Sequence, residues 1–273
     1  MIGGQASVVR PVRLAIYEVD RSRLAPDHRP PASTPMKIVI NHLTRMQKGF
    51  ICVAGVDLAT GQHVRPVLRS QMRKELLARY GGPFDIGRIV DLGWTKWIGT
   101  RPESEDYLFH QSEARVVGDM PEGEFWDLLR RAAKPKLVEI FGQDLLPRGS
   151  HSYAVDVNRG IASLGCYVPP SRPRLLLQRR DESSRGRIRL EFQSGEYQFE
   201  LSVTDIRLYR DDHVTPAPEV VERVAQRLQG DTDLILGVGL TRPFQSTPDE
   251  PALHWLQVNN LHFAGDPCWL QLR

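Results

Sequence analysis

The chain has 273 residues, of which 41% are hydrophobic and 25% are charged. These proportions are those of a globular protein with a buried core, and they exclude a chain that is disordered throughout. The formal net charge of +3 is too small to identify a nucleic-acid-binding protein by charge alone, so that argument depends on where the arginines lie.

The cysteines and the hydropathy pattern limit the environment of the protein. Cys52, Cys166 and Cys268 are far apart and form no C-x-x-C pair. This excludes a readable zinc ribbon or disulfide framework and is typical of buried thiols in a reducing cytoplasm. No apolar run approaches the roughly 20 residues that cross a membrane. We therefore expect a cytoplasmic protein with no membrane partner.

Residues 1–35 differ from the rest because they are rich in arginine and proline. We interpret them as a flexible basic leader and expect the folded part to begin at Met36.

The next segment, residues 36–168, is predicted to be mostly β, with short β-branched runs separated by glycine turns. Pro102 to Tyr107 reads as a polar loop. The predicted strands are 37–41, 49–58, 63–68, 88–94 and 163–168, and the predicted helices are 70–80, 122–133 and 136–141.

The proline-rich stretch 169–173 predicts a linker, because proline cannot donate to a strand ladder. Beyond it the pattern is again β. In one strand Arg187 and Arg189 alternate with apolar residues, which predicts a half-exposed strand with arginines on its solvent side. The predicted strands are 174–178, 187–192, 197–203, 233–240 and 254–263, and the predicted helix is 218–228.

These elements predict a mostly β protein with a few helices, built from two small β-barrels in the oligonucleotide-binding (OB) arrangement. We expect a leader at 1–35, a first OB-like barrel with a helical insert at 36–168, and a second OB-like barrel at 174–273. The alternative is a single mixed α+β domain.

An internal duplication is a further expectation. Leu43-Thr44-Arg45 follows one apolar strand and Leu240-Thr241-Arg242 ends another, and each is followed by a second strand and a glycine. The alternative is chance similarity between strands.

A first candidate site lies in and after the segment His42–Lys48. Arg45, Lys48, Arg65 and Arg69 supply cations, and guanidinium groups match phosphate oxygens well. We predict that they hold phosphates. The alternative is a solvated arginine surface, or an Arg45–Asp57 ion pair that stabilises the fold.

A second candidate site combines Arg242 with residues of the last strand. Trp255, Gln257 and Asn259 alternate along that strand and so share one face. An aromatic ring and two amides there suit the stacking and reading of bases. The alternative is that Trp255 belongs to the core and the amides satisfy backbone groups.

Catalytic motifs are not found. His42, Asp57, His63 and His254 are candidates for acid–base or metal chemistry, but their spacing fits no known metal-binding or nucleotide-binding motif. We therefore predict no enzyme, no cofactor and no metal site.

The motif order resembles a known family, the bacterial dual OB-domain proteins, over about residues 36–273. The segments that carry the resemblance are HLTRM, GFICVAGVDLATGQHVRPV, GGPFDIG, ASLGC, VTDIRLY, GVGLTRPF and HWLQVNNLH. The resemblance implies two OB barrels, no catalytic residues, and a sensing or tethering role among mobile-element or anti-phage conflict genes.

The leading hypothesis is a nucleic-acid-binding adaptor or sensor whose partner is DNA or RNA, more naturally single-stranded, together with a protein effector. One alternative is a metal-assisted nuclease or hydrolase that uses His42, Asp57, His63 or His254. Another is a protein-interaction module that docks a partner through sheet edges and the helix around Phe125–Leu129.

Overall fold

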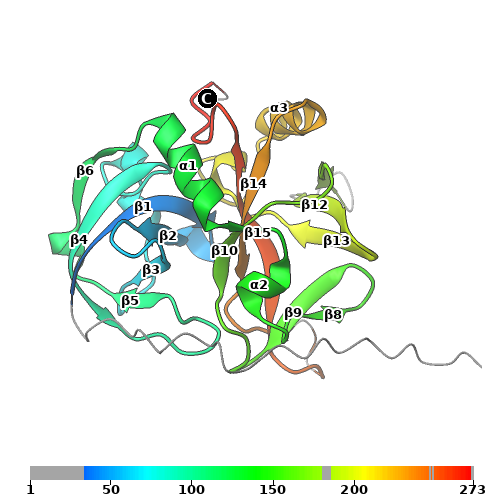
Figure 1. The fold of residues 1–273 in the computed structure, drawn as a ribbon, viewed down its shortest axis with the longest axis horizontal. Coiled ribbons are helices and arrows are strands. Elements are labelled where there is room, and N and C mark those ends of the chain that lie inside the picture. Colours follow the sequence, from blue (N-terminus) through cyan, green and yellow to red (C-terminus); the bar gives the residue numbers. More distant parts are fainter. Residues whose placement is uncertain (1–33, 180–185, 246, 248, 272–273) are drawn as a thin grey trace, which may run out of the picture. The chain divides into compact units, whose positions relative to one another are not determined.

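A computed structural model describes residues 34–179, 186–245, 247 and 249–271 (Figure 1). The predicted leader therefore lies outside the described residues except for its last two. Thr34 and Pro35 already belong to the first strand, so the described fold begins before Met36.

The N-terminal half contains a ring of five hydrogen-bonded strands. The pairing order is β1-β2-β3-β5-β4, and β4 pairs back to β1. Only the β3–β5 pairing is parallel. A sixth strand, β6, extends the sheet beside β4. The strands are β1 (Thr34–Arg45), β2 (Ile51–Asp57), β3 (His63–Val67), β4 (Arg88–Trp97), β5 (Asp106–Leu108) and β6 (Arg115–Asp119). We call β1 to β5 the first ring.

The C-terminal half repeats this order. Its first three strands form an antiparallel meander, its last two pair with each other, and a parallel bridge, Val203 to Val258, joins the third strand to the fifth. The elements are β11 (Arg174–Gln178), β12 (Arg187–Ser194), β13 (Tyr197–Ser202), α3 (Pro218–Gln229), β14 (Leu234–Leu240) and β15 (Leu253–Phe263). We call the five strands the second ring. The expectation of two OB-like units in a mostly β chain is confirmed.

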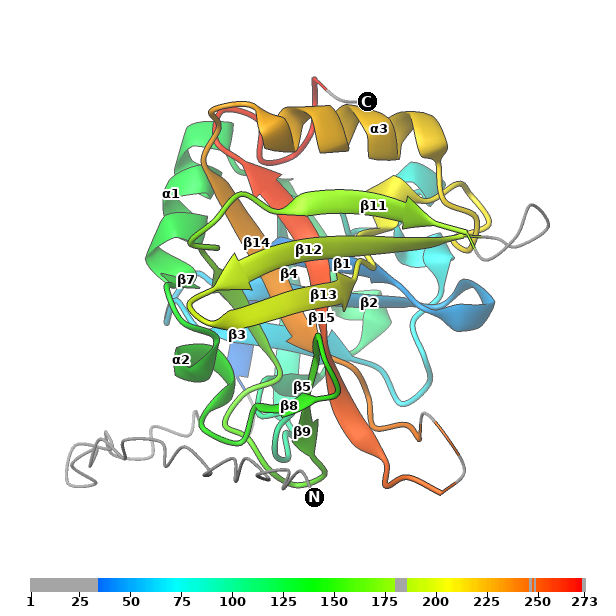
Figure 2. The same cartoon turned by 90° about the vertical axis from the view of Figure 1, so that its right-hand side faces the viewer.

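The second ring is closed less completely than the first. No pairing between β11 and β14 occurs among the described residues. Instead, α3 lies beside β11 (Figure 2) and buries Val221, Val224 and Leu228 in the core. These apolar side chains recur at helical spacing, which is why residues 218–229 form a helix here.

The segment between the rings extends the second one. It contains α1 (Glu122–Ala132), β7 (Ala133–Lys134), α2 (Leu137–Phe141), β8 (Leu146–Arg148), β9 (Ser152–Asp156) and β10 (Leu164–Tyr167). Strand β10 pairs with β14, and β9 pairs with β15, giving the order β7-β10-β14-β15-β9-β8. The sheets therefore do not follow the predicted boundary at 168–174: residues 133–167 share a sheet with the second ring.

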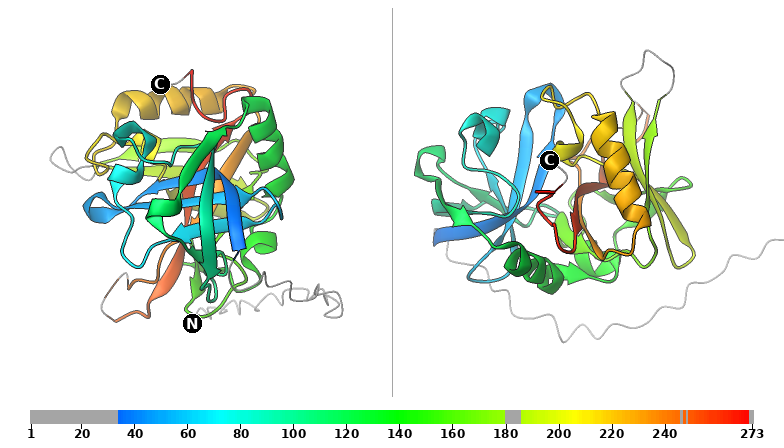
Figure 3. Two further views of the ribbon diagram at one scale, coloured as in Figure 1. Left: turned by 90° about the vertical axis from the view of Figure 1, so that its left-hand side faces the viewer. Right: turned by 90° about the horizontal axis from the view of Figure 1, so that it is seen from above.

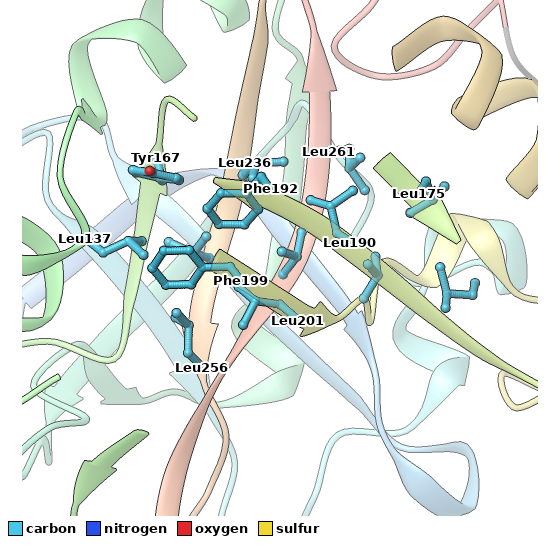
Figure 4. Packing of buried hydrophobic residues seen from close by; sticks show 14 of the residues in the cluster. Leu137, Tyr167, Leu175, Leu190, Phe192, Phe199, Leu201, Leu236, Leu256 and Leu261 are labelled. Atoms are coloured by element: carbon cyan, nitrogen blue, oxygen red, sulfur yellow. The ribbon is translucent and has the colours of Figure 1, made fainter. Parts of the chain in front are cut away.

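The core of the second half determines which side of strands β12 and β13 points away from it. The inward side chains of β12 and β13 pack on β14 and β15 (Figure 4). Phe192 and Phe199 stack with ring centroids 4.8 Å apart. Burying each such ring stabilises the fold by roughly 1.5–3 kcal/mol. Because strand side chains alternate, the residues between these core positions point away from the core.

The helix predicted at 70–80 is wrong. The segment instead contains two single-turn 3-10 helices, Lys74–Leu76 and Ala78–Tyr80. Its backbone bonds elsewhere: Ile51 N–H donates to Met72 O, and Phe84 N–H donates to Leu76 O. Tertiary pairing therefore overrides the local helical pattern.

The polar loop predicted at 102–107 is also wrong. Glu103, Glu105 and Asp106 are buried, and Asp106 begins β5. The polar local sequence suggested that these acids are exposed. The groups that they contact lie far away in the sequence, so a local pattern does not reveal their burial.

Two further expectations fail on placement. The first Leu-Thr-Arg tripeptide ends β1, the first strand of its ring, whereas the second lies at the end of β14, the fourth. The tripeptides therefore do not mark equivalent strands.

The helix around Phe125 is no docking surface, because Phe125, Leu128 and Leu129 are buried and Phe125 lies edge-on to His262.

None of the helices in the described part of the chain is long and apolar enough to cross a membrane.

Candidate nucleic-acid interface

The outward side of the first ring is covered by the second half. Figures 1 and 3 show β14 and β15 lying between the first ring and β11–β13. Asn260 of β15 binds both backbone groups of Leu43: Leu43 N–H donates to Oδ1 at 2.9 Å, and Nδ2 donates to Leu43 O at 3.3 Å. Thr44 forms an antiparallel bridge with Asp205. We call this side, with His42, Thr44, His63 and Arg65, the covered face.

Two predicted site residues are therefore inside the molecule. The Arg65 guanidinium donates to Asp106 at 2.5 Å, and its side chain is 4% exposed. Asn259 is buried, where its Oδ1 accepts from Gln257 Nε2 at 2.9 Å. Neither side chain is available to a nucleic acid in this arrangement, because the packing of the two halves against each other buries both of them.

Arg242 connects the two halves. Its guanidinium contacts Glu103 at 3.1 Å and Asp106 at 2.7 Å, both from the first half. The side chain is half-exposed, but two buried carboxylates already occupy its donors. Its evident role is to hold the halves together and to neutralise these acids.

Arg45 lies at the edge of the covered face, where the first half meets Thr204 and Tyr209 of the second half. We call this edge the seam. The backbone N–H of Arg45 donates to Thr204 O at 3.0 Å, and the Arg45 guanidinium stacks on Tyr209 at 4.3 Å. Burial raises the pKa of the Tyr209 hydroxyl, while Arg45 and Arg189 act to lower it. Arg45 of the first half therefore contacts Tyr209 directly, and the charge of Arg189 of the second half also acts on this hydroxyl.

These two arginines retain unused donors. Arg189 Nη1 donates to Ser202 Oγ at 2.7 Å, and Arg189 Nε lies 3.8 Å from Glu200. The Nε atoms of Arg45 and Arg189 are both buried and have no hydrogen-bond partner among the described residues. Unpaired buried donors are costly, and both arginine side chains are partly exposed, so an anion at the seam can reach their guanidinium groups.

The outward side of β12 and β13 is not covered by the first half. We call it the open face. Arg187 is exposed there, and Arg189 pairs in register with Ser202. Glu191 and Glu200 also lie on it, and Glu191 contacts Arg174 at 3.7 Å. The open face thus presents arginines interleaved with acids.

Lys48, three residues after Arg45, and Arg69 are both exposed. Lys48 lies in the β1–β2 loop with a positive φ of 59°, followed by Gly49 at 76°. Arg69 follows β3. The loop between the first two strands is one of the places where OB folds contact oligonucleotides.

Trp255 and Gln257 lie on the outward side of β15. Trp255 is half-buried, and its ring lies 6.2 Å from that of Phe244, which is 49% exposed. Gln257 lies one residue before Val258, and Ser202 lies one residue before Val203. Because Val203 and Val258 form a parallel bridge, Gln257 and Ser202 occupy matching positions on the two strands. Trp255 therefore lies on the same strand as Gln257, about 7 Å along it, and Phe244 packs beside Trp255 from the segment between β14 and β15.

The predicted acid–base residues are not assembled into one site. Asp57 accepts from Thr60 Oγ1 at 2.7 Å in its own turn, and this also excludes the Arg45–Asp57 pair considered above. His254 lies 3.6 Å from Glu103 in another region.

His42 and His63 do meet, together with Cys166, on the covered face, with ligand atoms within 4.8 Å of one another. Burial lowers the pKa of His42 and lowers that of His63 to about 4, and burial raises the pKa of Cys166 to about 12.

One further concave region adjoins the seam. A cavity of about 380 Å³ is lined by Leu77, Arg79, Arg207, Arg223 and Trp269, among others. Arg79 contacts Asp211 at 3.1 Å, and Arg207 contacts Asp205 at 2.7 Å. Because acids already neutralise two of these arginines, this cavity is a weaker anion site than the seam.

A family model described as a dual OB-containing domain matches residues 36–261, which is most of the chain. The chain belongs to the dual OB-containing domain family. The match covers both rings and the segment between them. None of the curated proteins compared with the chain matches it.

Three solved structures resemble this dual OB-containing chain weakly. The p204 HINb domain is 12% identical, covering 83% of this chain and 97% of its own, with a TM-score of 0.32. The tetrameric p202 HIN2 is 12% identical, with coverages of 83% and 94% and a TM-score of 0.30. A murine DNA-binding protein bound to double-stranded DNA is 10% identical, with coverages of 84% and 93% and a TM-score of 0.28. These TM-scores are too low to support any argument about the dual OB-containing chain.

Sequence reasoning left Arg187 and Arg189 of the dual OB-containing chain out of the candidate site. Their alternation with Ile188 and Leu190 already indicated arginines on the solvent side of a strand. The missing information was that this strand belongs to the ring whose outward side stays uncovered.

Proposed function

We propose that this chain binds single-stranded nucleic acid along the seam where the open face of β12 and β13 meets the β1–β2 loop. The observation that carries the proposal is the pair Arg45 and Arg189. Arg45 of the first half stacks on Tyr209, Arg189 of the second half bonds Ser202, and the Nε atoms of both are buried with no hydrogen-bond partner among the described residues.

The seam supplies phosphate contacts from both halves. Arg187 and Arg189 come from the open face, and Arg45 and Lys48 come from the end of β1 and its loop. Guanidinium groups bind phosphate oxygens through paired N–H donors, so a backbone that follows the seam meets successive cations.

The same surface favours a single strand. Glu191 and Glu200 reduce its net charge, so phosphate contacts alone give modest affinity. Trp255 and Phe244 offer aromatic surface on which exposed bases stack, and stacking contributes about 1–3 kcal/mol per base. Paired bases inside a duplex do not present their faces to such rings.

Fluorescence polarisation with labelled single-stranded DNA, single-stranded RNA and duplex DNA tests the proposal. We expect single strands to bind more tightly than the duplex, with affinity that falls as salt rises. In the double variant Arg187→Gln, Arg189→Gln, the slope of log affinity against log salt becomes shallower by about 1.4, because two phosphate contacts are lost.

The matched control is Arg115→Gln, Arg131→Gln, which removes the same charge from exposed positions on β6 and α1. The control keeps the wild-type salt slope. Equal slopes for the two double variants, or no binding of any strand at low salt, contradict the proposal.

We further propose that binding serves an adaptor or sensor role rather than catalysis, in a bacterial defence or conflict system. A protein effector would then associate with the chain differently in the presence and absence of a bound strand. Cleavage of the labelled strands by the purified chain with added divalent ions would contradict the non-catalytic part of this proposal.

A further inference from the structure

Four polar side chains meet on the covered face, away from the seam. They are Asn41 and His42 of β1, His63 of β3 and Cys166 of β10. The first three belong to the first ring, and the last belongs to the sheet of the second. None of them takes part in the proposed nucleic-acid contact.

The distances among these atoms are those of a tetrahedral shell. Asn41 Nδ2 lies 3.1 Å from His63 Nε2 and 3.3 Å from Cys166 Sγ, and His63 Nε2 lies 3.7 Å from that sulfur. Zinc–nitrogen, zinc–oxygen and zinc–sulfur bonds of about 2.0–2.3 Å in tetrahedral geometry separate neighbouring ligand atoms by about 3.3–3.6 Å. The ligand atoms of His42, His63 and Cys166 all lie within 4.8 Å of one another.

Two unpartnered atoms point to a missing occupant. His42 Nε2 and Asn41 Oδ1 are buried and have no hydrogen-bond partner among the described residues. Turning the Asn41 amide by half a revolution exchanges its two ends, so that Oδ1 takes the place of Nδ2 beside His63 and Cys166. The cluster then offers one oxygen, two imidazole nitrogens and one sulfur.

We propose that these side chains bind a zinc ion that links the two halves, with His42, His63 and Cys166 as ligands and Asn41 Oδ1 or a water as the fourth. Two imidazoles and a thiolate form a borderline-soft donor set that selects zinc over magnesium or calcium. Binding transfers the Cys166 thiol proton to solvent and leaves the thiolate on the metal. His63 is partly exposed and provides the route of entry.

The proposed zinc site has no open coordination position for a substrate, which distinguishes it from a catalytic zinc site. His42 is packed against Gly237 of β14, whose added Cβ would lie 3.0 Å from the imidazole ring, and Cys166 is fully buried. A substrate has no room to reach a metal held there. The role of the ion is therefore structural, and it fixes β10 against β1 and β3.

Metal content and Co²⁺ spectroscopy on the untagged full chain test the site. We expect one zinc ion per chain after purification. After removal of zinc with a chelator, titration with Co²⁺ gives the visible bands of tetrahedral cobalt and a near-ultraviolet thiolate-to-cobalt charge-transfer band, and both disappear on addition of Zn²⁺.

Cys166→Ala removes the charge-transfer band and weakens Co²⁺ binding by more than the roughly 10–100-fold typical of losing an outer-shell partner. Cys268→Ala is the matched control, because Cys268 is also a buried cysteine but lies outside the cluster. This control keeps both the band and the affinity.

The wild-type chain keeps the test decisive even if Cys166→Ala does not fold. Absence of the charge-transfer band in wild-type protein, or its persistence in folded Cys166→Ala, overturns the proposal. Loss of the band in Cys268→Ala with retention in Cys166→Ala overturns it too, because the thiolate would then come from another cysteine.

Discussion

The two OB-like rings share one strand order and use their outward sides in opposite ways. In the first ring this side is filled by Asn260, Asp205 and their neighbours from the second half. In the second ring the outward side of β12 and β13 remains free of the first half. The comparison shows that a shared fold does not fix a shared binding surface.

The covered face and the open face differ in the partners to which their polar groups bond. On the covered face, side chains of one half bond the backbone of the other: Glu105 accepts from the backbone N–H of Ser163 at 2.6 Å and of Leu164 at 2.9 Å. On the open face, Arg187 is exposed, and Arg189 and Glu191 contact side chains of the same half. Substitutions on the covered face are therefore expected to reduce stability, and those on the open face to reduce binding.

The largest expected effect is that of Arg65→Met. It removes one of the two arginine partners of buried Asp106, the other being the half-exposed Arg242, and breaking a buried ion pair costs about 3–5 kcal/mol. Urea unfolding measures the loss. Arg187→Met on the open face is the control and changes stability by less than about 0.5 kcal/mol. Equal stabilities for the two variants would show that Arg65 is not enclosed.

Asn260→Ala is expected to cost about 2–4 kcal/mol. The substitution leaves both Leu43 N–H and Leu43 O without their partner in a buried place, at about 1–3 kcal/mol for each group. Gln198→Ala, on the open face, provides the comparison in the same urea assay. A loss below about 1 kcal/mol in Asn260→Ala would mean that the halves separate in solution.

Acid is expected to weaken the seam through His213. Burial, Arg79 and Lys74 lower its pKa from 6.5 to about 4. Between these values the unfolded chain binds a proton that the folded chain does not, so the free energy of unfolding falls as the pH drops from 6.5 to 4.

The contribution of His213 is on the order of 1–3 kcal/mol, at about 1.4 kcal/mol per pKa unit. His213→Asn removes it and retains the positive φ of 56°, which asparagine tolerates. Urea midpoints measured across this pH range check the prediction. Parallel curves for the wild-type and variant proteins would contradict it.

The smallest expected effect is that of Phe244→Ala. Its ring is half-exposed, so stability changes by less than about 0.5 kcal/mol. Loss of one stacking surface weakens single-strand binding by about 1 kcal/mol and leaves duplex binding unchanged. Polarisation with both ligands separates these outcomes, and an equal loss for both would remove stacking from the account.

Local patterns were sufficient to predict most of the fold. The strands around Ile38 and Leu190 and the helix at 218–228 follow from apolar periodicity, and the two-unit organisation follows from turn spacing and family resemblance. Residues 70–80 were misassigned because Met72 O accepts from Ile51 of β2 and the backbone of Leu76 and Ala78 pairs with Phe84, contacts that a local pattern does not reveal.

The candidate site was harder to predict because exposure depends on how the rings pack together. Arg65 and Arg187 both lie between apolar neighbours on strands, a pattern that places an arginine on the outer side of a strand but does not show whether the other half covers that side. Arg45, which the sequence suggested as a phosphate contact, lies where the covered face ends and borders both environments. Its stacking on Tyr209 joins residues from opposite halves.

Photo-cross-linking of a 4-thiothymidine-containing single strand, followed by peptide mapping, tests most directly which outward side binds. The account predicts cross-links to the peptides of β12–β13 and of the β1–β2 loop, and none to β3. Cross-links concentrated on β3 (His63–Val67), with β12 unlabelled, would contradict it and would place the strand on the face that the second half covers.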